Sequence, residues 1–359
     1  MSEHDVMTLE GWGWDAQWDD QFERLDLQGC APARVVSQDR DRWTVQGSTG
    51  QTVARLASGV RLERYPVVGD WTAVRAGPMP SDPFSIVAVL PRRSAFSRGA
   101  AGAGTTEQVL AANVDLVWIV HGLEVPPNAR RIERYLAVAW ESGASPALVL
   151  TKADLAHDVA AASAEVAQLA LGVPIHVVST EDSTTADRLR SILPPARTVV
   201  LLGPSGVGKS TLLNLLANAT LASTGEVRSR DRKGRHTTTR RELFRIPGGA
   251  LVIDTPGLRE LRVWALGDGL AQAYPDIDAL AVACRFRDCR HESEPGCAVL
   301  EAVSSGRLTA ERLAGYRKLR AEAAYERRKV DPRARQAALA EHKAALKTMK
   351  YHPKFKKRD

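Results

Sequence analysis

The chain has 359 residues, of which 44% are hydrophobic and 25% charged, a composition typical of a soluble globular protein with two or three domains. No apolar run approaches the ~18 residues that would span a bilayer, and the acidic N-terminus lacks the layout of a secretory signal. We therefore expect a cytoplasmic protein with no membrane contact.

The net charge of +7 is concentrated near the C-terminus. Residues 326–359 hold twelve Lys or Arg against four Asp or Glu, so the rest of the chain is close to neutral. Such a segment is either a solvated helix face or an arm that neutralises nucleic-acid phosphates. Residues 331–359 are expected to form this basic tail.

The N-terminal part predicts a small all-β domain. Residues 1–28 form an extension with three tryptophans, expected to include a short helix that packs on a neighbour. In residues 29–96, five short β-branched or alternating runs are separated by turn residues, which predicts a five-stranded barrel of OB or SH3 type. Residues 92–108, rich in Gly, Ala and Ser, read as a mobile linker.

Residues 97–275 alternate strands with helices, which predicts a parallel sheet covered by helices. A ligand is then expected over the carboxyl ends of the strands. We expect strands at 114–120, 146–151, 174–178 and 198–202, and helices at 129–141, 155–171 and 184–193.

The central motif of this domain is a P-loop. A strand-length apolar run leads into Gly-x4-Gly-Lys-Ser and then into leucines at helical spacing, so a chance Gly-rich turn is disfavoured. Lys209 would reach the β- and γ-phosphates, and the Ser210 hydroxyl can ligate Mg²⁺. The expected nucleotide-binding residues are Gly203, Pro204, Ser205, Gly206, Val207, Gly208, Lys209, Ser210 and Thr211.

A second motif predicts the base. Thr151, Lys152, Ala153 and Asp154 follow a buried strand and resemble the Asn/Thr-Lys-x-Asp signature of GTPases. The Asp carboxylate accepts hydrogen bonds from the guanine N1–H and exocyclic amine, a pair of donors that adenine lacks. Taken alone, this sequence is more often a helix start with the Asp as N-cap. Ser179, after the next strand, is placed in a loop that closes over the base.

Two segments beyond the P-loop are expected to sense the γ-phosphate. The first, GRHTTT, is either a solvated charged loop or a switch in which Thr238 completes the Mg²⁺ shell. In the second, Asp254 would hold Mg²⁺ through water and the Gly257 N–H would contact the γ-phosphate. Leu258 stands where Ras-like enzymes carry a water-orienting glutamine, so His236 is the catalytic candidate.

The order of these motifs indicates a circular permutation. Base recognition precedes the P-loop, whereas ordinary GTPases run from the P-loop through the switches to base recognition. Compact domains with neighbouring termini tolerate this rearrangement. One consequence is that the second switch leads directly into the C-terminal part of the chain.

Residues 276–330 are predicted to form a mostly helical zinc-binding domain. Three thiols and one imidazole occur within 14 residues, a closed tetrahedral set typical of a structural zinc. The alternative is a coincidental cluster of reduced thiols. The predicted ligands are Cys284, Cys289, His291 and Cys297.

The barrel, the permuted GTPase and the Cys-x4-Cys-x-His-x5-Cys module, in that order, resemble the ribosome small-subunit-dependent GTPase family (RsgA/YjeQ) over residues 30–330. GPSGVGKST, GRHTTT and DTPGLRE match as they stand. Thr151 departs from the commoner Asn, which affects loop-bracing hydrogen bonds rather than guanine choice.

The resemblance implies an OB-fold barrel, a monomer, Mg²⁺ with GTP, and one structural zinc per chain. It also implies GTP hydrolysis stimulated by the small (30S) ribosomal subunit, acting in late maturation of that subunit through 16S rRNA contacts. Two alternatives stay open, a P-loop enzyme acting on a small substrate and a GTP-dependent RNA-binding switch with negligible catalysis.

Overall fold

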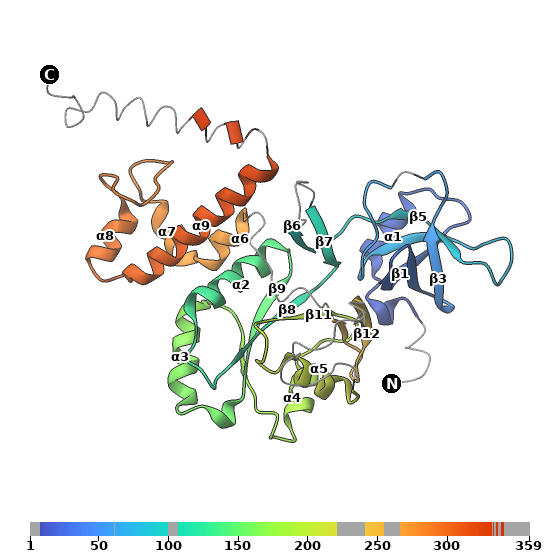
Figure 1. Cartoon of the computed structure of the whole chain (residues 1–359), viewed down its shortest axis with the longest axis horizontal. Coiled ribbons are helices and arrows are strands. Elements are labelled where there is room, and N and C mark those ends of the chain that lie inside the picture. The colour runs from blue at the N-terminus through green and yellow to red at the C-terminus, as the bar shows by residue number, and fades with distance from the viewer. Residues whose placement is uncertain are drawn as a thin grey trace, which may run out of the picture. The chain divides into compact units, whose positions relative to one another are not determined.

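The computed structural model describes residues 8–60, 62–99, 107–220, 241–254 and 266–331, together with residues 333, 335, 336, 339 and 340. It divides into two compact units, Met1–Ser97 with Val109–Leu261, and Arg98–Gln108 with Arg262–Asp359 (Figure 1). The predicted switch residues His236, Thr238, Gly257 and Leu258, and most of the basic tail, lie outside the described residues.

The N-terminal barrel is confirmed and has the OB-fold strand order. Its strands are β1 Ala31–Asp39, β2 Arg42–Gly47, β3 Gly50–Leu56, β4 Trp71–Arg75 and β5 Phe84–Val89. They close in the order β1-β2-β3-β5-β4-β1, with β3 and β5 parallel and the other pairs antiparallel. Alternate residues face inward because successive side chains of a strand point to opposite faces. The interior is filled by Ala33, Val35, Trp43, Val45, Ala54, Val74 and Ile86.

The tryptophan-rich extension packs against the barrel, as expected. It forms a 3₁₀ turn, η2 Glu10–Trp12, and a helix, α1 Ala16–Glu23, which Asp15 caps by accepting hydrogen bonds from two backbone N–H groups. Trp14 meets the barrel residue Trp71 edge to face, with ring centroids 4.7 Å apart. This contact buries apolar surface that the short helix could not bury alone.

The second domain of this unit is a parallel sheet in the order β10-β9-β8-β11-β13-β12, in which only β12 is antiparallel to its neighbour. Near-continuous apolar runs form its five parallel strands because both faces are covered, whereas β12 is mostly polar. The strands are β8 Leu116–Gly122, β9 Ser145–Thr151, β10 Ile175–Val177, β11 Thr198–Leu202, β12 Arg241–Arg245 and β13 Leu251–Asp254.

Helices connect these strands at the expected places. They are α2 Ala129–Glu141, α3 Val159–Leu169, α4 Thr185–Ser191 and α5 Lys209–Ala217, with a 3₁₀ turn, η3 Ala153–Leu155, before α3. Helix α2 is as predicted, and α3 and α4 are shorter than predicted. Helix α3 begins four residues later than predicted because Asp158, and not Asp154, is its N-cap. Asp154 is therefore available for another role.

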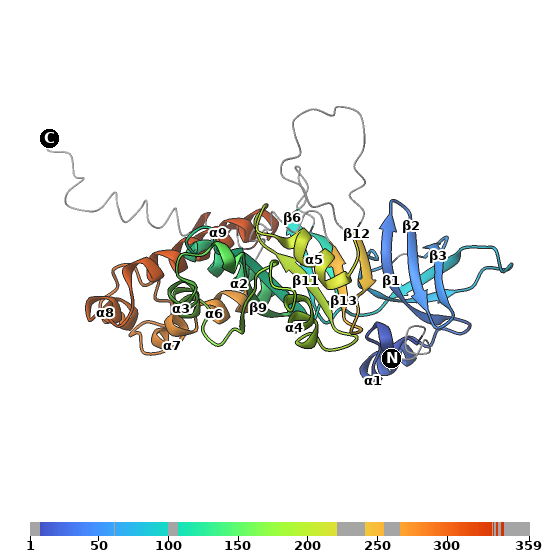
Figure 2. The ribbon, with the colours of Figure 1, turned by 90° about the horizontal axis from the view of Figure 1, so that it is seen from below.

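The barrel and the GTPase sheet are continuous. Strand β12 pairs with β13 on one side and with the barrel strand β1 on the other (Figure 2). The expected linker is ordered at both ends, because β6 Ala95–Gly99 and β7 Glu107–Ala112 form a two-stranded sheet. The sequence pattern missed this pairing, since Gly-, Ala- and Ser-rich stretches carry little strand signal.

The second unit holds four helices among its described residues, α6 Asp268–Ala273, α7 Pro275–Ala281, α8 Ala298–Ser304 and α9 Ala310–Val330. Its core includes Arg312, which pairs bidentately with Asp276 and lies over the Tyr274 ring. Such a fork is a strong, geometrically specific contact that fixes α9 against α7. Within the described part of the chain, no helix combines the length and hydrophobicity needed to cross a bilayer.

Candidate nucleotide site and zinc centre

The P-loop connects β11 to α5 through backbone conformations that favour glycine. Gly203 has φ 151°, and a Cβ there would lie 2.4 Å from the Val120 carbonyl oxygen of β8. Gly208, with φ 92°, precedes α5 without a side-chain cap. The helix therefore presents the positive end of its dipole to the loop, as an anion site requires.

The P-loop lysine is folded over its own loop. Lys209 Nζ donates to the carbonyl oxygens of Gly203, at 2.9 Å, and Pro204. This position keeps the ammonium at the loop, where phosphate oxygens are expected. Of the other loop residues, Val207 is buried, whereas Ser205, Gly206 and Thr211 are exposed to solvent.

A cavity of about 30 Å³ lies where Mg²⁺ is expected. Lys209 and Ser210 line it from the start of α5, and Asp254 lines it from the end of β13. This volume exceeds the ~10–15 Å³ that a site needs to hold one water molecule. Hydroxyl and carboxylate oxygens are ligands that Mg²⁺ prefers, so Ser210 and Asp254 fit the ion.

The base-recognition strand is bonded directly to the P-loop. Thr151 Oγ1, fully buried, donates to the Val207 carbonyl oxygen at 2.7 Å. Thr151 therefore braces the loop. The departure from Asn had left it in question whether this residue could do so. Because a hydroxyl donates one hydrogen, the longer contact of 3.3 Å to the His121 carbonyl oxygen is secondary.

The side chains expected to contact guanine are held from two sides. Lys152, with φ 56°, pairs through Nζ with Glu124 at 2.7 Å. Asp154 is exposed and accepts a hydrogen bond from Ser179 Oγ. The structure thus brings Ser179, expected in the loop that closes over the base, into contact with the aspartate. Sequence reasoning missed Glu124, since nothing local marks a residue whose partner is 28 positions away.

Of the expected switch residues, only Asp254 lies among the described residues. Asp254 ends β13, where its cross-strand partner is Glu242 of β12. His236, Thr238 and Gly257 belong to segments outside the described residues, so their roles stay predictions.

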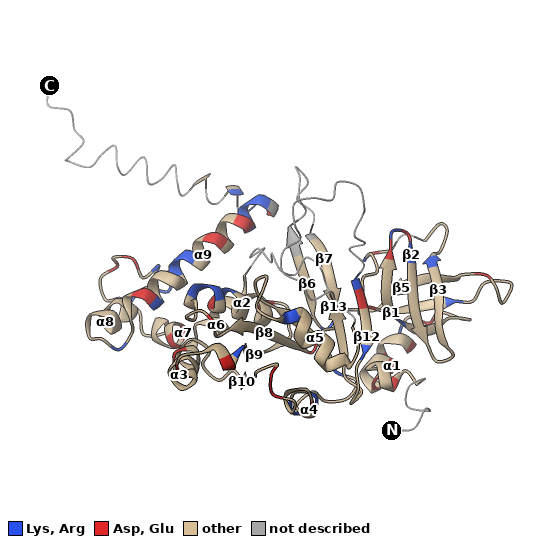
Figure 3. Cartoon of the chain, turned by 60° about the horizontal axis from the view of Figure 1, so that its bottom comes forward, with Lys and Arg blue, Asp and Glu red and all other residues tan. Residues whose placement is uncertain are grey.

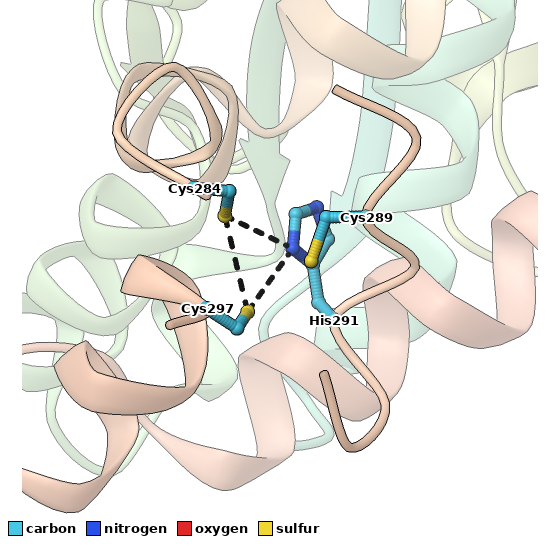
Figure 4. A group of neighbouring side chains, drawn as sticks. All are labelled: Cys284, Cys289, His291 and Cys297. Atoms are coloured by element: carbon cyan, nitrogen blue, oxygen red, sulfur yellow. Dashed lines mark hydrogen bonds between the residues drawn. The ribbon is translucent and has the colours of Figure 1, made fainter. Parts of the chain in front are cut away.

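The four predicted zinc ligands converge on one point (Figure 4). His291 Nδ1 lies 3.4 Å from Cys297 Sγ and 3.7 Å from Cys284 Sγ, and the two sulfurs are 3.9 Å apart. All four ligand atoms, including Cys289 Sγ, lie within 4.8 Å of one another. Zinc–sulfur bonds of ~2.3 Å in a tetrahedron imply sulfur–sulfur separations of roughly 3.8 Å, so the donor set fits a structural zinc.

Two neighbours that sequence reasoning missed support this centre. Glu294 accepts backbone N–H hydrogen bonds from Arg290, Glu292 and Ser293, and these lower the pKa of its carboxyl to about 2. The Tyr316 ring of α9 lies beside His291, with ring centroids 6.1 Å apart. The carboxylate shapes the loop that carries His291, and the tyrosine joins the loop to α9.

Comparison with known proteins agrees with this geometry. The RsgA GTPase family model matches residues 89–264. A protein of Opitutus terrae is 44% identical over 342 residues, covering 91% of this chain and 92% of that protein. The chain belongs to the RsgA GTPase family. A relative in Streptomyces coelicolor is 44% identical over 341 residues, covering 94% of this chain and 92% of its own. Both relatives are called small ribosomal subunit biogenesis GTPase RsgA.

Solved structures show the same fold. YjeQ from Thermotoga maritima aligns with a TM-score of 0.62 at 26% identity, covering 82% of this chain and 98% of that one. YloQ, described as a circularly permuted GTPase, aligns with a TM-score of 0.60 at 23% identity, covering 82% and 96%. The family name states that its members are GTPases. The order of the motifs in this chain agrees with the description of YloQ as circularly permuted.

Proposed function

We propose that this protein hydrolyses GTP when stimulated by the small (30S) ribosomal subunit, and that it acts in late maturation of that subunit through contacts with 16S rRNA. The observation that carries the GTP assignment is the Thr151 to Val207 hydrogen bond, which holds the guanine-reading strand against the phosphate loop. The names of the relatives supply the small subunit as partner.

The residues divide the work on GTP as follows. Asp154 accepts hydrogen bonds from the two guanine donors, and the Lys152 stem lies along the base. Lys209 and the start of α5 hold the phosphates. Ser210 and Asp254, with Thr238, would hold Mg²⁺, which when bound neutralises charge on the β- and γ-phosphates. His236 is proposed to position the attacking water, and the Gly257 N–H to contact the γ-phosphate.

Two RNA-facing parts are consistent with this role. The OB fold is a recurrent nucleic-acid-binding barrel. Figure 3 shows Lys and Arg recurring along α9, where Lys318, Arg327, Arg328 and Lys329 are exposed. Basic side chains of this kind neutralise phosphates and release counterions. We further propose a cytoplasmic monomer without membrane contact.

The test is GTP turnover with and without purified small subunits, over a range of salt concentrations. We expect turnover to be slow for the protein alone, to rise with small subunits and not with large ones, and to fall as salt increases. Binding of small subunits without any gain in turnover would favour the GTP-dependent RNA-binding switch instead. Equal turnover of GTP and ATP would overturn the guanine assignment.

A further inference from the structure

Strand β12 joins the barrel to the Mg²⁺-binding end of the GTPase sheet. Glu242 of β12 lies opposite Ser37 of the barrel strand β1 and also opposite Asp254 of β13. Neighbouring strands are ~4.8 Å apart, so Ser37 and Asp254 are separated by about 10 Å across one row of the sheet. No side-chain linker intervenes, because the connection is the main-chain ladder itself.

Part of the edge of β1 is left uncovered by β4 and pairs with β12. Strand β4 covers β1 only at residues 31–34, and the pairing of β1 with β2 shifts register between Val35 and Ser37. Such an irregularity bends a strand and redirects its edge. The edge beyond it pairs with β12 at Ser37 and Gln38. Without β12, the backbone groups of this edge would be left unpaired.

The opposite end of the same strand is anchored to the P-loop strand. The Arg34 guanidinium is buried and donates to Thr198 Oγ1, at 2.8 Å, and to the Asn113 carbonyl oxygen. It also donates to the carbonyl oxygens of Trp12 and Gly69. Burial lowers the pKa of Arg34 to about 10, which leaves it charged at neutral pH, so these are charge-assisted bonds.

Because Arg34 is held in place, a movement of the barrel acts mainly further along β1, where this strand pairs with β12. A Cβ at Gly69 would lie 2.0 Å from the Ala112 carbonyl oxygen, so the backbones of the two domains already touch there. Close-packed contacts transmit displacement because they cannot be compressed. A force on the barrel surface therefore acts on the pairing of β1 with β12.

The charges in the row make this pairing sensitive to the nucleotide. Opposed residues of antiparallel strands place their side chains on one face, ~4.5–5.5 Å apart at Cβ, and like charges there are destabilising. Glu242 and Asp254 are such a pair. A cation bound at Asp254 would offset this repulsion, so the pairing of β13 with β12 would be stronger in the cation-bound protein than in the cation-free protein.

We propose that β12 transmits occupancy of the barrel by RNA to Asp254, with Glu242 as the positioning residue, and so couples subunit binding to GTP hydrolysis. This inference rests on the proposed function. The coupling is reciprocal, so the nucleotide state also changes the affinity of the barrel for its RNA.

A reversible cross-link tests the proposal. Gln38→Cys with Arg241→Cys, in a Cys30→Ser background, places two thiols on opposed residues of β1 and β12 at a separation that a disulfide can bridge. The matched control is Thr44→Cys with Val53→Cys, which opposes two thiols on β2 and β3, two strands of the barrel itself, at a position where Val53 is exposed. Zinc content is measured after oxidation in both proteins.

We expect the oxidised β1–β12 variant to keep its basal turnover but to lose ~5-fold or more of the stimulation by small subunits, and to regain it on reduction. The oxidised control should be stimulated fully. Full stimulation of the oxidised β1–β12 variant would overturn the inference alone. A wild-type protein that small subunits do not stimulate would overturn the proposed function, and the inference with it.

Glu242→Gln provides a second measurement that needs no disulfide. Removing one of the opposed charges should reduce the ratio between small-subunit affinities in the GTP-analogue and GDP states. Arg245→Lys, on the same strand, is the control for a general effect of substitution in β12. An unchanged ratio in Glu242→Gln would contradict the role given to this residue.

Discussion

Thr151 Oγ1 donates a 2.7 Å hydrogen bond to the Val207 carbonyl oxygen, which joins the strand that reads the base to the loop that holds the phosphates. The two residues are 56 positions apart, and both are buried. The bond gives Thr151 a defined role in holding the phosphate loop.

Thr151→Val should weaken GTP binding. The substitution keeps the shape but removes the donor, leaving the buried Val207 carbonyl oxygen without this partner. A hydrogen bond contributes about 0.5–1.5 kcal/mol, which corresponds to a roughly 2- to 13-fold rise in Kd. A fluorescent-nucleotide titration measures the change, with Thr151→Asn as the donor-retaining control. Equal affinities for Thr151→Val and the wild type would show that the bond contributes nothing.

Asp154→Asn should shift binding from guanine towards xanthine nucleotides. The amide can no longer accept both guanine donors, but it can donate to the second xanthine oxygen. Competition titrations with GTP, XTP and ATP test this. Asp158→Asn is the control, because asparagine caps α3 as well as aspartate does. If wild-type protein binds GTP and ATP equally, the assignment fails.

His236→Ala should abolish turnover stimulated by small subunits while leaving GTP affinity and particle binding nearly intact. The reason is that His236 is proposed to position water only in the docked enzyme, where Leu258 cannot do so. Single-turnover kinetics with and without subunits measure the effect, with the exposed His157→Ala as control. Stimulation that survives in His236→Ala would remove this histidine from the mechanism.

Cys289→Ser should lower the zinc content of the protein and expose the second unit to protease. The binding free energy of a structural zinc contributes directly to folding. Metal analysis of native protein, expected to give one zinc per chain, and limited proteolysis test this, with Cys30→Ser as the control thiol. Protease resistance that chelation leaves unchanged would contradict a structural role.

Glu294→Gln should speed amide exchange in the loop that carries His291. The pKa of the Glu294 carboxyl is about 2, below its ordinary 4.5, because backbone N–H groups hydrogen-bond the ionised form. Its stabilising contribution is therefore complete above about pH 4.5 and is lost as the pH falls towards 2. Hydrogen exchange at pH 7 measures the difference, with Glu292→Gln as control. Identical exchange in the two variants would rule out the carboxylate as the organiser of the loop.

The sequence determined the elements whose chemistry is local. The P-loop, the Thr151 to Asp154 signature and the four zinc ligands are each read from residues a few positions apart, because chain geometry over such distances is restricted. Their order along the chain also revealed the permutation. The alternation of strands and helices also predicted that a ligand would lie over the carboxyl ends of the strands.

Only the tertiary structure decided the contacts between distant residues. The brace from Thr151 to Val207, the pairing of Lys152 with Glu124 and the ordering of both ends of the expected linker leave no local pattern. The row of Ser37, Glu242 and Asp254 joins two domains that the composition separated. Register between strands more than 200 residues apart depends on how whole domains pack, and no window of sequence contains that information.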